Sequence, residues 1–323
     1  MKLIKDCIYR LINVPEVCLK FIDTFEFQRL RHIKQLGFVH YVYPSAVHTR
    51  FEHSLGVMHL SGVMVDILDS TSGISSDLRQ SVEITPREKD MVQVAGLLHD
   101  VGHVGGSHFI DYILAENGME EHEERSIKIL KRINDRVKVF SLEEIDTIAH
   151  MIRGEVQVGH KPFLFEIVSN SLTGLDVDRF DYLQRDLYHT GVGSYQPDYL
   201  LQCARVENGH IVFLEKAREE VKRLYETRRQ MFSQVYRHKT ILSLEVLVRE
   251  CVKELNLLDF WSEDEWLNFD DVEFIGRLKK VKRFSDAIYT REWGRNKIVN
   301  RFEHCSLTDE ESIKVQLEKV VFV

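Results

Sequence analysis

The sequence of 323 residues contains few prolines and few cysteines. With only 5 prolines, long stretches carry no residue that ends a helix, which favours a mainly α-helical fold. The 5 cysteines lie far apart, are odd in number and form no Cys-x-x-Cys pair, so neither a zinc knuckle nor a disulfide framework is expected. Charged residues close to Met1 interrupt the first apolar residues of the sequence, which argues against a secretory signal. We expect an intracellular protein, cytoplasmic or nuclear.

The sequence also lacks a long apolar run and an excess of basic residues. The stretch 58–68 comes closest to the length of a membrane span, but His59, Ser61 and Asp66 interrupt it. Lys and Arg number 43 against 51 Asp and Glu, a net charge of −8. We therefore expect no membrane partner, and nucleic acid is not expected as the main partner. The total charge does not exclude a small anionic substrate, because the field in a cleft is local.

Hydrophobic periodicity predicts several helices and one β-hairpin. Thr85, Pro86 and Glu88 form a capping box with proline at the first helical position. The apolar stripe that follows ends just before His99 and Asp100, so this helix delivers both side chains at its carboxyl end. Further helices are expected over 51–68, from about 176, and over 241–258. Asn-Gly at 208–209 separates two short alternating runs over 204–214 and predicts a hairpin.

We place a boundary near residue 240, where the motifs rich in chemistry stop. Residues 1–240 would form the catalytic core, and residues 241–323 a helical extension packed on that core. No internal repeat or low-complexity tract is present.

Three islands of histidine and acidic residues carry the chemistry. The first spans 48–56, the second spans 95–103 with His108 and Asp111 after it, and the third spans 176–182. In the third, Asp178, Tyr182 and Asp186 recur every four residues and so share one face of the expected helix. Such a polar face is unfavourable in a hydrophobic core, so we expect it to line a cleft that contains water.

The islands resemble the HD-domain phosphohydrolases, whose metal ligands follow the pattern H…HD…D. The chain is most similar to the deoxynucleoside triphosphate (dNTP) triphosphohydrolases, in particular to the catalytic core of their vertebrate SAM- and HD-domain members. The resemblance also covers 27–31, 33–37 and 166–170, and it extends from residue 2 to about 285. It implies a mainly α HD-domain fold with a small β-hairpin.

The resemblance implies a divalent metal ion held by His53, His99, Asp100 and Asp178. Two imidazoles with two carboxylates suit Fe, Mn, Zn or Ni better than a structural zinc site, and Mg could accompany the triphosphate.

The implied reaction is hydrolysis of a dNTP to a deoxynucleoside and inorganic triphosphate. The 5′-oxygen leaves poorly without a proton, and we expect His108 to supply it, with Asp111 orienting the ring. His122 and Glu123 match a second catalytic histidine and its acidic neighbour, and His103 would lie beside the metal and the phosphates.

The remaining matched positions would bind the substrate. Arginines suit phosphate oxygens, Tyr182 would pack on the sugar, and Asp186 would accept the 3′-hydroxyl. Tyr236 would exclude a ribose 2′-hydroxyl. The full expected set is Gln35, Leu36, Arg50, Arg179, Tyr182, Asp186, Arg228 and Tyr236.

A further set resembles a regulatory site between subunits that takes a GTP or dNTP activator. It comprises Asp23, Gln28, Arg31, Arg205 and Lys216. The match is partial, because Leu214 and Glu220 stand where these relatives carry arginine and asparagine. The corresponding assembly is a homodimer or a homotetramer.

Two alternatives stay open. The first is another HD-domain nucleotide phosphohydrolase with a monophosphate substrate, which would not need the arginines at 179 and 228. The second is a catalytically silent, nucleic-acid-binding HD protein that uses the basic residues over 277–283.

Overall fold

The computed structural model describes residues 2–71, 83–257, 263–292 and 309–323. Its described part is mainly α-helical and contains two antiparallel two-stranded sheets, β1–β2 and β3–β4. The mainly α fold with a small hairpin is therefore confirmed. Among the described residues, no helix has both the length and the apolar character needed to cross a membrane.

A hairpin that the sequence did not predict opens the chain. Strand β1 (Lys2–Asp6) pairs with β2 (Arg10–Val14), with Lys2 opposite Val14. Its turn contains neither Asn-Gly nor glycine, and Arg10 itself adopts a positive φ of 63°. The usual sequence signal for a hairpin turn is thus missing. After it come α1 (Glu16–Ile22), α2 (Phe25–Gln28), η1 (Arg29–His32) and η2 (Gly37–Tyr41).

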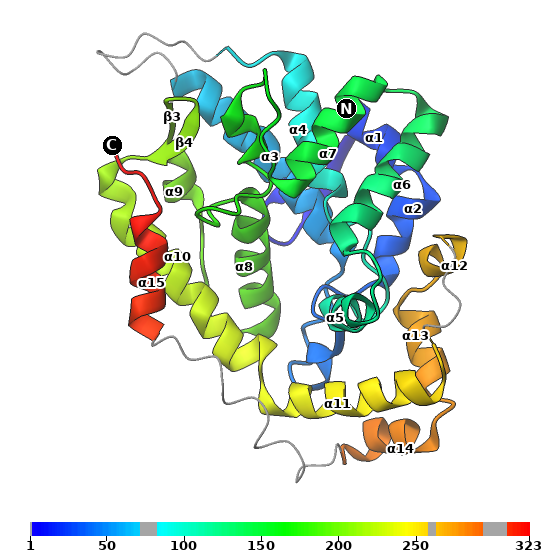
Figure 1. Ribbon diagram of the computed structural model, residues 1–323. Coiled ribbons are helices and arrows are strands. Elements are labelled where there is room, and N and C mark those ends of the chain that lie inside the picture. Colours follow the sequence, from blue (N-terminus) through cyan, green and yellow to red (C-terminus); the bar gives the residue numbers. More distant parts are fainter. Residues whose placement is uncertain (1, 72–82, 258–262, 293–308) are drawn as a thin grey trace.

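Three long helices form the centre of the molecule. Helix α3 (Arg50–Thr71) packs against α4 (Pro86–Leu98) and α8 (Val177–Thr190) (Figure 1). The capping box of α4 is present, since Thr85 accepts from the backbone of Glu88 and the Glu88 carboxylate returns to Thr85. Residues 91–98 of α4 are all buried, so this helix lies deep in the core. Asp176 caps α8 by accepting from the Arg179 N–H.

The helices between α4 and α8 surround this centre. They are α5 (His108–Glu116), α6 (His122–Val137), α7 (Leu142–Arg153) and the short η3 (Pro162–Phe165). Helix α7 begins with a second capping box, formed by Ser141 and Glu144, and ends at Gly154, whose φ is 68°.

The predicted hairpin is confirmed and is followed by a long helix. Strands β3 (Ala204–Glu207) and β4 (His210–Phe213) join through Asn208 and Gly209, both at positive φ. Helix α9 (Asp198–Gln202) precedes the hairpin, and η4 (Glu215–Ala217) follows it. The next helix, α10 (Arg218–Met231), continues into a π-helical turn, η5 (Phe232–Tyr236). Single π-turns often occur at functional sites.

The helices after residue 240 lie against the rest of the chain. They are α11 (Lys239–Glu254), α12 (Glu263–Leu267), α13 (Asp271–Leu278), α14 (Lys282–Thr290) and α15 (Asp309–Glu318). Helix α11 contacts η2, α13 and α14, while α15 packs along α10 (Figure 1). The division of the chain into two parts near residue 240 stays a prediction.

Candidate active site

Side chains from α3, α8 and the turn after α4 bring their metal-binding atoms together. His53 Nε2 lies 3.4 Å from Asp100 Oδ2 and 3.1 Å from Asp178 Oδ1. His99 Nε2 lies 3.5 Å and 3.3 Å from the same two oxygens. Ligands bound at about 2.1 Å to one ion are separated by about 3.0–3.4 Å at octahedral or tetrahedral angles. These histidine–carboxylate separations fit a divalent cation, and the ligand atoms of His53, His99 and Asp100 all lie within 4.8 Å of one another.

The outer ring nitrogens of the two histidines are already occupied. His53 Nδ1 donates to Asp181 Oδ2 at 2.7 Å, and His99 Nδ1 donates to the Gly96 carbonyl at 2.8 Å. Each Nε2 is buried without a hydrogen-bond partner. Such outer hydrogen bonds fix the tautomer that turns an Nε2 lone pair toward a metal. The orphaned Nε2 atoms are the second observation that fits a metal site.

Opposite charges dominate the electrostatics of this cluster. Burial opposes protonation of His53, but the carboxylates of Asp100, Asp178 and Asp181 outweigh it and raise the pKa of His53 well above its usual value. Burial likewise disfavours the charged form of Asp100, yet the Arg50 guanidinium holds the pKa of this carboxyl well below its usual range. The carboxylates of Asp100 and Asp178 thus favour positive charge at this point, which a protonated His53 supplies when no ion is bound.

A buried network supports His53 from behind. Asp181 accepts both guanidinium bonds of Arg185 at 2.9 Å, and Arg185 also donates to Asp6 at 2.9 Å. The Tyr9 hydroxyl donates to Asp181 at 2.8 Å. This network was not predicted from the sequence. The four-residue spacing of Asp181 and Arg185 was the available signal, whereas nothing local connects the amino-terminal hairpin to α8.

Further histidines lie next to the cluster, on α5, α6 and the turn between α4 and α5. His103 Nε2 lies 3.2 Å from Asp100 Oδ1, and its Nδ1 lies 2.6 Å from Asp111 Oδ2. The His122 ring stacks on His103 with centroids 4.0 Å apart. We expected Asp111 to orient His108, but the structure pairs it with His103 and also with Arg125. The Asp111 carboxylate thus contacts His103, whose ring also lies next to Asp100.

The two expected proton-transfer histidines differ in exposure. His108, the first residue of α5, has an exposed side chain, while desolvation by the surrounding protein and the positive charges of Arg50 and His103 lower its pKa. Burial and the neighbouring His103 lower the pKa of His122, whose Nδ1 lies 3.3 Å from Glu123 Oε2. An anionic substrate beside these rings would favour their protonated forms.

Arg50 occupies an interior position. Its side chain is fully buried, its Nε donates to Ser107 Oγ at 3.0 Å, and its Nη1 pairs with Asp100. The remaining Nη2 is buried without a hydrogen-bond partner. Arg50 therefore neutralises a candidate metal ligand and still has one donor to offer.

The expected sugar-binding residues form a second polar cluster. Asp186 is buried, accepts from the Tyr236 hydroxyl at 2.6 Å, and lies 2.7 Å from His48 Nε2. The π-turn η5 places Tyr236 at this point. His48 belongs to the first island but had no expected role, and its contact with Asp186 could only be seen in three dimensions.

Two arginines, Arg179 and Arg228, lie beside Tyr182. Burial raises the pKa of Tyr182, while the charges of Arg179 and Arg228 act against that rise. The Nε atoms of both arginines are buried without a hydrogen-bond partner. Gln35 is buried with an unpartnered Oε1, and Leu36 packs against the core beside it. These unused polar atoms are ready to bind a ligand.

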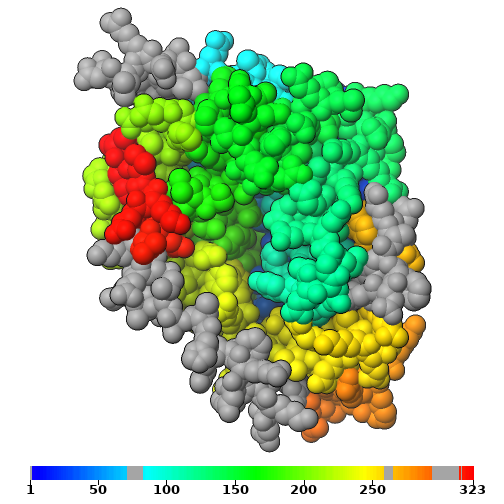
Figure 2. Space-filling view, in the orientation of Figure 1, coloured from blue at the N-terminus to red at the C-terminus, as the bar shows by residue number. Residues whose placement is uncertain are grey.

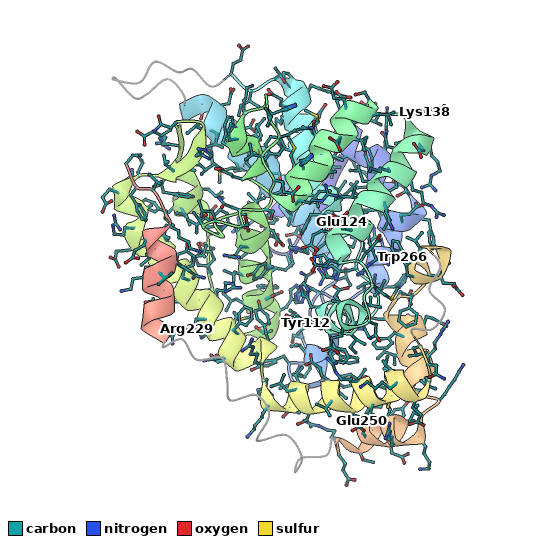
Figure 3. The ribbon with its side chains drawn as sticks, viewed as in Figure 1. Tyr112, Glu124, Lys138, Arg229, Glu250 and Trp266 are labelled. Atoms are coloured by element: carbon teal, nitrogen blue, oxygen red, sulfur yellow. The ribbon has the colours of Figure 1, made fainter. Side chains whose placement is uncertain are left out.

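A hollow runs between α8 and the helices α5 and α6, with the blue amino-terminal part of the chain visible at its floor (Figure 2). The sticks in Figure 3 show side chains of α8 and α5 filling the region between these helices, with Tyr112 labelled on α5. The helices that border this hollow carry Asp178 on α8, His108 and Asp111 on α5, and His122 on α6.

The expected regulatory residues form two sets that lie apart in the structure. Arg31 donates to Gln28 at 2.8 Å and stacks over the Phe51 ring at 3.5 Å, and Asp23 is exposed at the end of α1. Arg205 donates to backbone carbonyls near β3, and Lys216 is exposed on η4. Helix α2 and strand β3 lie on opposite sides of the molecule (Figure 1). One copy of the chain therefore does not bring the two sets together.

Comparison with known proteins identifies relatives. The family model described as HD domain matches residues 50–186. A protein described as a deoxynucleoside triphosphate triphosphohydrolase SAMHD1 homolog from Dictyostelium discoideum is 36% identical over 301 residues, which covers 90% of this chain and 54% of that protein. Deoxynucleoside triphosphate triphosphohydrolase SAMHD1 from Homo sapiens is 32% identical over 320 residues, covering 89% of this chain and 48% of that protein.

A solved structure agrees with these relatives. A hypothetical protein from Aquifex aeolicus superimposes with a TM-score of 0.75 at 32% identity, covering 90% of this chain and 75% of that chain. The chain spans about half the length of the curated relatives it matches. Residues 50–186 thus match the HD domain family, and the chain is similar to the SAMHD1 deoxynucleoside triphosphate triphosphohydrolases over about half of their length.

Proposed function

We propose that this chain is a metal-dependent dNTP triphosphohydrolase that releases a deoxynucleoside and intact inorganic triphosphate. The observation that carries this proposal is the convergence of His53, His99, Asp100 and Asp178, with separations of 3.1–3.5 Å, beside a second cluster of histidines. The activity in the names of the Dictyostelium discoideum and Homo sapiens relatives supports the choice of substrate class.

The four converging side chains would hold the divalent ion. Their mixed nitrogen and oxygen donors suit Fe, Mn, Zn or Ni, and Mg would enter with the triphosphate. When bound, the ion supplies Lewis acidity toward phosphate oxygen and water.

His108 would donate a proton to the leaving group. The oxygen of water bonds to the α-phosphorus as the bond from phosphorus to O5′ breaks, and O5′ takes the proton of His108. One proton of the water restores His108 and the other remains with the triphosphate, so the atoms balance. His122, with Glu123 beside it, would serve as a second catalytic histidine in the same cluster, where Asp111 contacts His103 and the rings of His103 and His122 lie next to His108.

The arginines would bind the triphosphate. Arg179 and Arg228 each carry a buried, unpartnered Nε, and Arg50 carries an unpartnered Nη2. Buried guanidinium donors bind phosphate oxygens strongly, because both partners are charged. The global excess of acidic residues does not oppose this, since the field in the cleft is local.

The cluster around Asp186 would bind the sugar. Asp186 would accept the 3′-hydroxyl, with Tyr182 packing on the ring of the sugar and Gln35 and Leu36 forming the opposite wall. The Tyr236 hydroxyl, 2.6 Å from Asp186 Oδ2, would occupy the space of a ribose 2′-hydroxyl.

Regulation and assembly belong to the same proposal. Asp23, Gln28 and Arg31 of one copy would meet Arg205 and Lys216 of another around a GTP or dNTP activator, because one copy keeps these sets apart. The assembly would be a homodimer or homotetramer, and the location intracellular, in cytoplasm or nucleus.

Product analysis tests the proposal. Purified protein is incubated with each dNTP and Mn²⁺, with and without GTP, and the products are separated by anion-exchange chromatography. Deoxynucleoside and triphosphate in equal amounts are expected. Release of diphosphate or monophosphate would contradict the proposed reaction, and turnover of nucleoside monophosphates alone would favour the other HD-domain phosphohydrolase class.

A further inference from the structure

A carboxylate from the carboxyl-terminal part of the chain reaches into the active-site loops. Asp271, the first residue of α13, is buried. Its Oδ1 accepts from the Gly106 N–H at 2.8 Å, and its Oδ2 accepts from the Lys34 N–H at 2.9 Å. Lys34 Nζ lies 3.3 Å from the same Oδ2. One side chain thus joins two loops that are distant in sequence.

The two loops lead directly to proposed functional residues. Lys34 precedes Gln35, and Gly106 lies two residues before His108. The neighbouring Asp270 caps α13 by accepting from Val272 and Glu273, so the helix does not need Asp271 for its own cap. The carboxylate of Asp271 is therefore directed to the loops and not to its own helix.

The turn that Asp271 holds leaves no spare room. A Cβ on Gly105 would lie 2.3 Å from the Asp270 carbonyl oxygen, and the Gly105 N–H donates to Phe269 at 2.7 Å. A Cβ on Gly106 would lie 2.7 Å from the Phe274 ring. Helix α13 and its preceding residues are thus packed against the backbone of this turn.

The turn also contains strained backbone immediately before His108. Ser107 adopts φ 52° and ψ −140°, a conformation that residues other than glycine rarely occupy. Its hydroxyl donates to the Lys34 carbonyl at 2.7 Å and accepts from Arg50 Nε at 3.0 Å. Such a conformation persists only where several contacts hold it, and Asp271 binds both Gly106, which precedes Ser107, and Lys34, whose carbonyl accepts from the Ser107 hydroxyl.

From these contacts we infer that Asp271 is a positioning residue that fixes the start of α5, and with it His108, relative to Gln35 and Arg50. The inference rests on the proposed role of His108 as proton donor to O5′. It also implies that the segment after residue 240 is part of the working active site. Displacement of a reacting group by about 1 Å can cost about 100-fold in rate.

The substitution Asp271→Asn tests this positioning role with little change in shape. A carboxylate accepts from all three donors, whereas an amide has one acceptor oxygen and turns its NH₂ toward a donor. The turn should therefore shift without loss of the core. We expect kcat for a dNTP to fall by about 10- to 100-fold.

An analogue with sulfur in place of the 5′-bridging oxygen separates positioning of the proton donor from general damage. A thiolate leaves without prior protonation, so a misplaced His108 should matter little. Asp271→Asn and His108→Ala should both lose turnover of the normal dNTP and keep the analogue within about 3-fold of wild type. The double variant should be no slower than the slower single variant, because both changes affect one proton transfer.

Controls distinguish the possible failures. Glu273→Gln, on the exposed face of the same helix, should match wild type. Equal loss of both substrates in Asp271→Asn, or unchanged turnover of the dNTP, would overturn the positioning role. Equal loss in His108→Ala alone would instead contradict the proton-donor assignment in the proposed function. If Asp271→Asn fails to fold, Lys34→Met provides the test, because it removes only the contact from Nζ to Asp271. This variant must show the same selective loss of dNTP turnover, in smaller degree. Equal turnover of the dNTP by Lys34→Met and wild type would overturn the inference.

Discussion

Hydrogen bonds from Nδ1 orient the two histidines of the cluster so that each Nε2 is available to a metal ion. His53 and His99 each donate through Nδ1 and leave a buried Nε2 without a partner. A buried polar atom without a partner costs free energy, so these atoms require an explanation. The proposed cation between them and the two carboxylates would provide it.

Replacement of Asp100 should remove both metal and activity. Asp100→Asn substitutes an amide for a carboxylate that lies 3.4 Å and 3.5 Å from the two histidine Nε2 atoms. We expect the bound metal to fall below about one tenth of the wild-type amount, and turnover to fall by more than about 100-fold. Elemental analysis of the purified protein and a dNTP assay measure the two effects. The exposed Asp135→Asn serves as the matched control, and full activity in Asp100→Asn would contradict the ligand assignment.

Tyr236 should determine how well ribonucleotides are excluded. Tyr236→Ala opens the space beside Asp186, whereas Tyr236→Phe keeps the ring and loses only the 2.6 Å hydrogen bond. We expect Tyr236→Ala to raise kcat/KM for a ribonucleotide relative to its dNTP by about 10-fold or more. Tyr236→Phe should change that ratio by less than about 3-fold. An unchanged ratio in the alanine variant would mean that another group contacts the 2′-position.

At the scale of elements, residues at the ends of helices determine where a helix begins and which neighbouring helix it contacts. Glu144 completes the capping box of α7 and pairs with Arg87 of α4, with Oε1 2.5 Å from Nε. Hydrogen bonds from Arg87 and from the backbone of Ser141 outweigh partial burial and lower the pKa of Glu144 to about 2. One side chain therefore starts a helix and joins it to its neighbour.

The pH dependence of this contact has a definite sign. The pKa of Glu144 is lower in the folded state than the value of about 4.3 for an unfolded chain. Its stabilisation is therefore complete above about pH 4.3 and is lost as the pH falls toward 2. Glu144→Gln keeps the cap and removes the charge, so we expect a loss of about 0.5–1 kcal/mol at pH 7 that shrinks at pH 3.5.

Urea unfolding of wild type and Glu144→Gln at the two pH values measures this difference. Glu226→Gln on the exposed face of α10 gives the effect of removing an ordinary surface charge. A difference that grows as the pH falls would show that the ionised Glu144 does not stabilise the native state.

Sequence-based predictions were confirmed where the signal was local, and contacts between segments distant in sequence were missed. Thr85 with Glu88, and Asn208 with Gly209, are local signals, and both predicted structures are present. The amino-terminal hairpin was missed because Arg10, not glycine or asparagine, occupies the left-handed position of its turn. Asp271 and the pairing of Asp111 with His103 depend on contacts between distant segments, which neither periodicity nor spacing reports.

At the scale of the whole molecule, the separated regulatory residues predict that nucleotide drives association. Addition of GTP with a dNTP should raise the sedimentation coefficient, and Arg31→Ala should weaken this response, because Arg31 is exposed and would bind the activator. Lys128→Ala, an exposed cation elsewhere on the surface, is the matched control. A sedimentation coefficient unaffected by nucleotides would contradict the proposed activator site.

The position of the attacked phosphorus is the central claim of this account. The reaction is carried out with a dNTP in ¹⁸O-labelled water, and the products are followed by ³¹P NMR spectroscopy and mass spectrometry. We predict triphosphate carrying one ¹⁸O atom on a terminal phosphorus and an unlabelled deoxynucleoside. Pyrophosphate or orthophosphate as the primary product, or ¹⁸O in the deoxynucleoside, would contradict hydrolysis at the α-phosphorus.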